Sequence, residues 1–335
     1  MLASSSSDKS VLVWNMSNGS RLFKFQHANA VRELAYVSEL NYLASGSSDS
    51  IRIWDLAAGT LKFVLNITDK DAYESLSTNV VVTSGSQLLA AGSNLGQIKV
   101  FDIGRGTLKL RLNATKGQTP VYALAFFGSE LLCSGGGYWT YGPSLKVWNV
   151  STGVLKHSLD AVNGSHTDSI VRLAVLERSR LLVSYSWDNT IKVWNLTLPD
   201  VILVRTILPF ENACSVCTIE LIVLGDKLIA CGLFRYIKVY DVTTGELKIR
   251  IDELTGRYAY YVTALAFSSS GLLVSANQFP SVSVWNLTTG VAKFRFDAFS
   301  GGVNSSVNGL ALIGEELIAT GADDASIKIF GNNIF

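Results

Sequence analysis

The sequence predicts an all-β protein whose strands form a β-propeller of four-stranded antiparallel blades. Three observations support this prediction. A short segment with an aromatic residue next to its last position, such as VLVWN at 11–15 or IKVWN at 191–195, recurs along the 335 residues. Its copies are about 40–50 residues apart, which is the period of propeller repeats. Between the copies lie short apolar runs separated by Ser, Thr, Asn and Gly, a composition typical of strands and turns.

Eight copies of this segment divide the chain into repeat units. In order they are VLVWN, IRIWD, IKVFD, LKVWN, IKVWN, IKVYD, VSVWN and IKIFG, and the units end near residues 15, 55, 102, 149, 195, 241, 286 and 331. The pattern continues from the first unit to the last without a break in composition. We therefore expect a single domain, 1–335.

Each unit divides into four strands. The first is nearly continuously apolar, as in VYALAFF (121–127), which fits a strand close to the axis of a propeller. The second, as in LLVSYS (181–186), leads into the aromatic-ended third strand, and a turn with Asn or Gly leads to the fourth, as in ELKIRI (246–251). One blade cannot bury both of its faces, so neighbouring blades must stack. Each buried aromatic hides roughly 150–250 Å², worth on the order of 4–6 kcal/mol, which explains its recurrence without a ligand.

The repeat resembles that of the WD40-repeat family over essentially the whole chain. In that family a His before the first strand, a Ser or Thr in the second, an Asp in the next turn and a Trp in the third form a hydrogen-bonded chain. Two units contain the whole set, namely His27, Ser45, Asp49 and Trp54, and His166, Ser184, Asp188 and Trp194. The resemblance implies that the carboxylate fixes the imidazole, the imidazole reaches the hydroxyl and the indole N–H completes the chain, which orders the blade.

Other units depart from this set. Ala91 and Cys231 stand where the hydroxyl is expected, Arg235 replaces an Asp, and Phe330 has no N–H to donate. We expect these blades to depend more on apolar packing. The Ser, His and Asp of the complete sets are also the residue types of a hydrolase triad. A structural role is favoured because Ser184 lies within a strand, without a strained elbow, and because the set occurs twice.

The number of blades is open at this stage. The second and third strands occur eight times, but the first and fourth occur seven times each. We favour eight blade-like units with an incomplete first one, and the alternative is a seven-bladed ring closed from both termini. A segment missing upstream of Met1 would explain the incomplete unit.

Composition argues against several other classes of protein. The formal net charge is +1, so no field of the whole protein would attract nucleic acid or an anionic membrane. The uncharged stretches 75–98 and 258–292 are interrupted by polar residues and Gly, so neither offers the roughly 20 continuous apolar residues that a membrane-spanning helix needs. Cys214 and Cys217 form a lone C-x-x-C without a second pair. We therefore expect free thiols, no metal, no cofactor and a cytoplasmic location, with the nucleus left open.

The turns contain more aromatic residues than turns need. In WD40 propellers the turns between second and third strands, and those before the first, share one rim. The residues that we expect to contact a partner on this rim are Arg32, Tyr122, Tyr138, Trp139, Tyr141, Trp187, Phe234, Tyr260 and Tyr261. Aromatic residues with an Arg are typical of interaction hot spots. The alternative is that about half of them fold back to fill the axial channel or cover their own blade.

The resemblance implies a non-catalytic scaffold that binds a protein or peptide on this rim, as a monomeric subunit of a larger complex. One alternative is a propeller hydrolase or lyase with an axial pocket, but Glu33 and Glu220 are the only acidic residues in the first strands. Another is a propeller that binds phosphoinositide or nucleic acid. It would need clustered basic residues, which only folding could gather on one edge. The fold alone does not name the partner.

Overall fold

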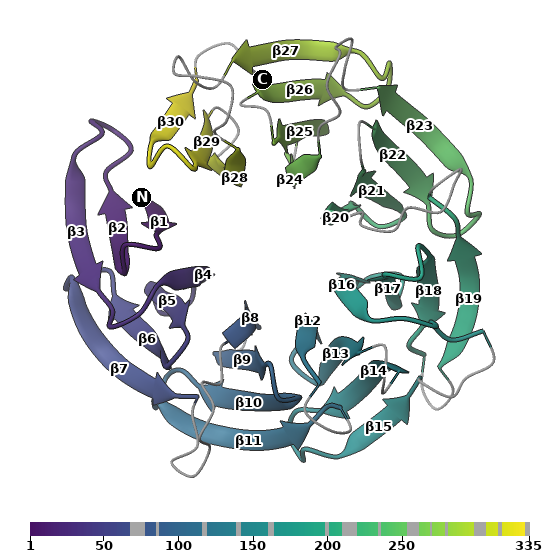
Figure 1. Ribbon diagram of the computed structural model, residues 1–335, viewed down its shortest axis with the longest axis horizontal. Helices are drawn as coiled ribbons and strands as arrows, with labels where there is room; N and C mark the ends of the chain where they lie inside the picture. The colour runs from purple at the N-terminus through teal and green to yellow at the C-terminus, as the bar shows by residue number, and fades with distance from the viewer. Residues whose placement is uncertain are drawn as a thin grey trace. The chain divides into compact units, whose positions relative to one another are not determined.

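The computed structural model describes residues 1–67, 78–84, 87–115, 119–138, 142–159, 164–197, 201–209, 220–233, 236–252, 261–268, 270–278, 281–297, 306–313 and 317–331. These residues form β-strands joined by turns (Figure 1). They divide into two compact units, Met1–Val175 and Leu176–Phe335, which we describe one at a time. The single domain expected for 1–335 stays a prediction.

The first unit contains one three-stranded sheet followed by three four-stranded sheets, all antiparallel. Their strands are, in sheet order, β1 (Leu2–Ser5), β2 (Ser10–Trp14) and β3 (Arg21–Gln26); β4 (Val31–Val37), β5 (Tyr42–Ser47), β6 (Ser50–Asp55) and β7 (Thr60–Asn66); β8 (Thr78–Thr83), β9 (Leu88–Ser93), β10 (Gln97–Asp102) and β11 (Thr107–Asn113); and β12 (Val121–Phe127), β13 (Leu131–Tyr138), β14 (Gly142–Asn149) and β15 (Leu155–Ser158). The unit boundary falls within the next strand, β16 (Ile170–Leu176).

The second unit continues the same order. After β16 come β17 (Leu181–Ser186), β18 (Ile191–Asn195) and β19 (Ile202–Ile207); β20 (Glu220–Leu224), β21 (Leu228–Gly232), β22 (Tyr236–Asp241) and β23 (Leu247–Asp252); β24 (Val262–Phe267), β25 (Leu272–Asn277), β26 (Ser281–Asn286) and β27 (Ala292–Asp297); and β28 (Val307–Ile313), β29 (Leu317–Ala322) and β30 (Ile327–Phe330).

The described residues therefore form eight sheets, of which the first and the last have three strands. As far as the described residues reach, the first sheet lacks the first strand of the repeat and the last sheet lacks the fourth, as the strand counts in the sequence indicate. The prediction of an all-β propeller with eight blade-like units and an incomplete first one is confirmed. The seven-bladed alternative is wrong.

The second and third strands are the most deeply buried. All six residues of β9 are buried, whereas the first strands β4 and β16 are only half-buried along their middle. A first strand has a pairing partner on one edge only, so its apolar sequence does not make it the centre of the core. In the first unit, Figure 1 shows β4, β8 and β12 on the concave side of the row of sheets and β7, β11 and β15 on the convex side.

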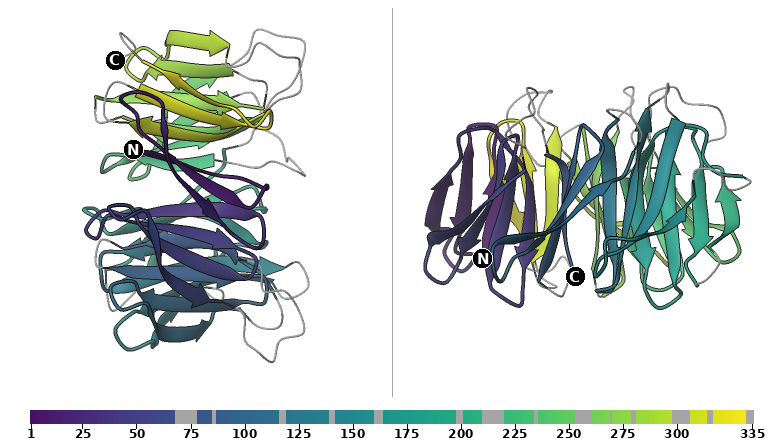
Figure 2. Two further views of the ribbon diagram at one scale, coloured as in Figure 1. Left: turned by 90° about the vertical axis from the view of Figure 1, so that its left-hand side faces the viewer. Right: turned by 90° about the horizontal axis from the view of Figure 1, so that it is seen from below.

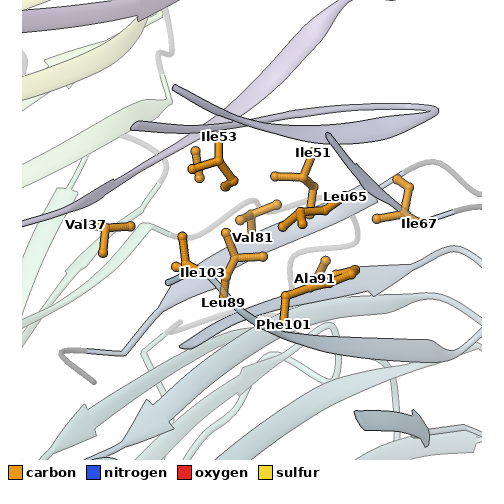
Figure 3. Close-up of a cluster of buried hydrophobic side chains, with 11 residues drawn as sticks. Val37, Ile51, Ile53, Leu65, Ile67, Val81, Leu89, Ala91, Phe101 and Ile103 are labelled. Atoms are coloured by element: carbon orange, nitrogen blue, oxygen red, sulfur yellow. The ribbon is translucent and has the colours of Figure 1, made fainter. Parts of the chain in front are cut away.

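The core of the first unit lies between neighbouring sheets. Figure 3 shows one such cluster, in which Ile51, Ile53 and Leu65 of the second sheet meet Leu89 and Phe101 of the third. Ile51, Ile53 and Leu89 are fully buried. Each fully buried aliphatic side chain contributes about 1.5–3 kcal/mol. Stacking of sheets is therefore what stabilises each blade, as the repeat predicts.

A short turn joins the third strand to the fourth in most blades. In the second blade, the Asp55 carboxylate accepts the backbone N–H of Ala57 at 2.9 Å, and Gly59 donates to the Asp55 carbonyl at 2.8 Å. Gly59 has φ +69°, and a Cβ at this position would lie 2.2 Å from the Phe23 ring of the preceding blade. Only glycine fits both the backbone conformation and this approach.

A basic residue of the third strand ties each of several blades to the blade before it. Lys99 of β10 is buried, and its Nζ donates to the Ile67 carbonyl just after β7 at 2.8 Å. Lys146 of β14 reaches the Ala114 carbonyl after β11 at 2.5 Å. In the second unit, Lys238 of β22 donates to the Pro209 carbonyl at 2.8 Å. We call these lysines inter-blade clamps, because each ammonium group donates a hydrogen bond to a carbonyl of the preceding blade.

Candidate functional site

The predicted histidine-centred set in the second blade forms a continuous hydrogen-bonded chain. The Trp54 indole N–H lies 2.8 Å from the Ser45 hydroxyl, which lies 2.7 Å from Nε2 of His27. Nδ1 of His27 lies 3.2 Å from the Ser47 hydroxyl, and Ser47 donates to the Asp49 carboxylate at 2.7 Å. The carboxylate thus acts on the imidazole through Ser47, a residue that the sequence analysis did not single out.

Burial determines the protonation of this chain. It lowers the pKa of His27 to about 4, helped by the charge of Arg52 and opposed by that of Asp49. A neutral imidazole with its hydrogen on Nδ1 lets every bond of the chain run in one direction, from the indole to the carboxylate. Burial alone would raise the pKa of Asp49, but hydrogen bonds from Ser47 and other donors hold it below its ordinary value.

Most of the set in the fifth blade is also buried, and Asp188 is half-buried. Trp194 and Ser184 are inaccessible to solvent, and the indole N–H donates to the hydroxyl at 2.8 Å. Asp188 accepts the backbone N–H of Thr190 at 2.9 Å and its hydroxyl at 2.7 Å. His166 is buried as well, at 3% exposure, and belongs to the first unit.

Indole–serine bonds occur beyond the two complete sets. Three further blades contain one, from Trp14 to Ser4 at 3.2 Å, from Trp148 to Ser134 at 3.0 Å and from Trp285 to Ser275 at 2.8 Å. Each Ser lies on the second strand and faces the third-strand Trp. The sequence contained this signal, since every Trp that ends a third strand comes 9–14 residues after its Ser.

Two of the three blades that lack the indole also lack the hydroxyl; the last blade has the buried Thr320 at the serine position and Phe330 at that of the Trp. In the third blade, Ala91 replaces the Ser and Phe101 replaces the Trp, and both pack in the apolar cluster of Figure 3. In the sixth blade, the buried Cys231 takes the position of the Ser and Tyr240 that of the Trp. In the third and sixth blades the indole donor and the hydroxyl acceptor are absent together, as expected where an unpaired buried group costs free energy.

Two of the rim residues of the first unit, Tyr122 and Tyr138, lie near each other. The pairing of Val121 with Gly136 places Tyr122 at the end of its sheet where β13 turns toward β14. Tyr138 is the last residue of β13 and is exposed. Burial raises the pKa of Tyr122, and the nearby Tyr138 and Asp168 raise it further. Arg32 is exposed in β4, at the corresponding end of its own sheet.

The glycine run Gly135–Gly137 serves close packing in this hairpin. A Cβ on Gly135 would lie 2.7 Å from the Ile170 side chain, and one on Gly136 would lie 2.2 Å from the Pro120 carbonyl. Gly137 adopts φ +128° and donates to the same Pro120 carbonyl at 3.3 Å. The run lies within β13, which pairs with β14, and does not precede a helix, so a phosphate loop does not fit.

The rim residues of the second unit that the structure describes are Trp187 and Tyr261. Trp187 is 45% exposed and occupies the β17–β18 turn, which the Asp188–Thr190 hydrogen bonds fix. Tyr261 is half-buried, just before β24, and its carbonyl accepts the N–H of Gln278 at 2.9 Å. Trp139, Tyr141, Phe234 and Tyr260 lie outside the described residues. That all nine residues form one patch stays a prediction.

The described residues offer little to a catalytic or metal site. Within the described part, no group of three or more His, Cys, Asp or Glu residues could hold a metal ion. Cys133 and Cys231 are buried free thiols; burial raises the pKa of Cys133 to about 12 and raises that of Cys231 as well. Cys214 and Cys217 lie outside the described residues. Among the residues described, there is no helix of the length and apolarity that crossing a bilayer requires.

Comparisons with known proteins agree with these blades. The family model described as WD domain, G-beta repeat, matches residues 19–55 and 155–195. Autophagy-related protein 16 of Arabidopsis thaliana is 29% identical over 39% of this chain and 24% of its own length. Apoptotic protease-activating factor 1 of Rattus norvegicus is 29% identical over 41% of this chain and 11% of its own length. The chain therefore spans a quarter or less of these curated relatives.

Solved structures share the fold over nearly the whole chain. A crystal structure of the computationally designed Ika8 protein matches with a TM-score of 0.77 and 24% identity, over 98% of this chain and 92% of that one. A chain in a crystal structure of the mitotic checkpoint complex matches with a TM-score of 0.68 and 19% identity, over 90% of both chains. The class that the blades define is the β-propeller. Within that class, the resemblance to the WD40-repeat family is confirmed.

Proposed function

We propose that this propeller is a non-catalytic interaction scaffold that binds a protein or peptide segment on its loop rim. The observation that carries the proposal is Trp187, a large aromatic side chain held 45% exposed on a turn that its neighbours fix. An exposed Trp on a rigid turn loses little conformational freedom when a partner covers it. Trp and Tyr are also the residues most often found at binding hot spots.

A second part of the rim, in the first unit, supports the same function. Exposed Tyr138 lies beside half-buried Tyr122, with Arg32 exposed on another sheet of this unit. Tyrosine rings offer apolar area with a hydroxyl that can hydrogen-bond a peptide backbone. These residues suit an extended segment that lies across the blade ends.

The similar proteins add general support. The mitotic checkpoint complex, by its description, is an assembly of proteins. We extend from it only the expectation that this propeller works within a complex, where it binds partners without chemistry of its own. The histidines His27 and His166 favour this, since both are buried and His27 is part of the hydrogen-bonded chain of its blade.

The test is affinity purification of the intact chain followed by mass spectrometry, compared between Trp187→Ala, Tyr138→Ala and a control. Tyr36→Ala is a suitable control because Tyr36 is an exposed aromatic residue at the opposite end of β4. We expect the two rim variants to lose the partners that the wild type and the control retain. Their thermal stability should change by less than about 0.5 kcal/mol. Unchanged partner recovery, or unfolding of the rim variants, would contradict the proposal.

A further inference from the structure

The outer strands of the first unit carry charge of one sign. These fourth strands, β3, β7, β11 and β15, contain six Lys and Arg residues and no Asp or Glu. The basic residues are Arg21, Lys24, Lys62, Lys109, Arg111 and Lys156. A chain with net charge +1 thus places a basic strip on this side, although its sequence has no run of basic residues.

Strand register aligns part of this strip. Lys62, Lys109 and Lys156 each follow the residue that pairs with the third-strand aromatic, and each is the unpaired residue of a bulge that recurs in these blades. All three are exposed. The strands are also neighbours, because the Phe63 side chain approaches the turn at Gly106 and Leu110 approaches the turn at Gly153. Figure 1 shows β7, β11 and β15 following one another on the convex side of this unit.

The lysines of this strip have few partners inside the protein. Among the described residues, Lys109 and Lys156 make no hydrogen bond or ion pair, and Lys62 lies 6.0 Å from the Tyr42 ring. In the second unit, one of the fourth strands, β23, has its basic residues paired with acidic residues of the same segment. There Lys248 pairs with Glu246 at 2.6 Å and Arg250 with Asp252 at 3.1 Å.

Exposed aliphatic side chains stand between the basic ones. Leu22, Leu61, Val64, Leu108 and Leu155 are all exposed on the same four strands. The aromatic rings Phe23 and Phe63 are turned inward against neighbouring glycines. The left view of Figure 2 has the outer side of the first sheets, purple to blue, toward the viewer, with no further strand over them.

We propose that this outer face of the first unit binds an anionic phospholipid membrane surface. Lysine attracts acidic headgroups as a point charge, and the Leu and Val side chains beside it favour the interface between headgroups and acyl chains. Single-stranded nucleic acid fits less well because the outward side chains offer no aromatic ring for bases to stack on. Protection of an edge strand explains a charged residue on each strand but does not require one sign of charge.

The test is co-sedimentation of the purified chain with vesicles of phosphatidylcholine containing phosphatidylserine, and with vesicles of phosphatidylcholine alone. We expect binding only to the anionic vesicles, and loss of binding as salt is raised. Lys62→Glu with Lys109→Glu should weaken binding by at least about 25-fold, since each basic residue near the surface contributes about fivefold. Both substitutions keep the outer strand charged, so edge protection remains.

The matched control is Lys248→Glu with Lys293→Glu, which changes the net charge equally on outer strands of the second unit. The control pair should retain most of the binding. Equal loss in the two pairs would show an effect of net charge and overturn the proposal, as would absence of wild-type binding. Tighter binding of a single-stranded oligonucleotide or polyglutamate than of the vesicles would also overturn it. Lys156→Glu alone, with an expected fivefold loss, provides the same test should the double variant not fold.

Discussion

Replacement of Ser45 by Ala tests the hydrogen-bonded chain of the second blade. The Ser45 hydroxyl is fully buried, accepts the Trp54 indole N–H at 2.8 Å and lies 2.7 Å from Nε2 of His27. Its loss leaves two buried polar groups without that partner. Each such group costs about 1–3 kcal/mol, so we expect Ser45→Ala to lower the free energy of unfolding by about 2–4 kcal/mol.

The third blade shows how this loss can be reduced. There Ala91 and Phe101 occupy the positions of Ser45 and Trp54, and the pair packs without polar groups. Adding Trp54→Phe to Ser45→Ala removes the unpaired indole N–H. The double variant should therefore be less destabilised than the sum of the two single variants, by about 1–2 kcal/mol.

The assay is urea denaturation of the wild type, the two single variants and the double variant, which together form a double-mutant cycle. Ser17→Ala is the control because Ser17 is an exposed turn residue, and its cost should stay within about 0.5 kcal/mol. If Ser45→Ala costs no more than this control, the hydroxyl does not stabilise the blade. If the single-variant costs simply add, the indole and the hydroxyl are not coupled.

Three further predictions follow from buried groups and backbone geometry. Because burial lowers the pKa of His27 from 6.5 to about 4, unfolding is favoured as pH falls through this range, and His27→Gln should flatten the slope of stability against pH measured by thermal denaturation. Gly59→Ala should cost about 1–3 kcal/mol more than Gly19→Ala, since both have a positive φ but only Gly59 faces a neighbouring ring; equal melting temperatures would refute this. Cys133 and Cys231 should react with a thiol reagent only on unfolding, and fast reaction of the native protein would contradict their burial.

Much of the fold could be predicted because each unit repeats the same short residue pattern. The aromatic at the end of each third strand, the Asn or Asp that begins the next turn and the Gly that ends it recur at nearly constant spacing. These recurring residues predicted the eight units and the order of the strands in each. The apolar sequence of the first strands predicted a place near the axis but did not indicate their partial exposure, since strand sequence does not reveal that one edge has no partner.

The site was harder to predict than the fold. Ser45 and Trp54 follow from the family pattern, but Ser47 does not, because its role depends on the distance between an imidazole and a carboxylate in the folded turn. The basic strip was not visible either, since Lys62 and Lys109 lie 47 residues apart and become neighbours only through blade stacking. Patterns within one unit can be recognised in the sequence. Surfaces formed by several units cannot, because they depend on strand register and on how the blades stack.

The inter-blade clamps have a consequence for how the blades fold while the chain is being synthesised. Lys99 reaches back to Ile67, and Lys146 reaches back to Ala114, so each blade is completed by residues that follow it by 32 positions. While the chain leaves the ribosome, the carbonyl that follows the fourth strand of the newest sheet has no hydrogen bond from a lysine, because the lysine that donates it has not yet been synthesised. We expect the most recently synthesised sheet to be less stable than the earlier ones at every stage. Each sheet should reach its full stability only when the next sheet has been synthesised.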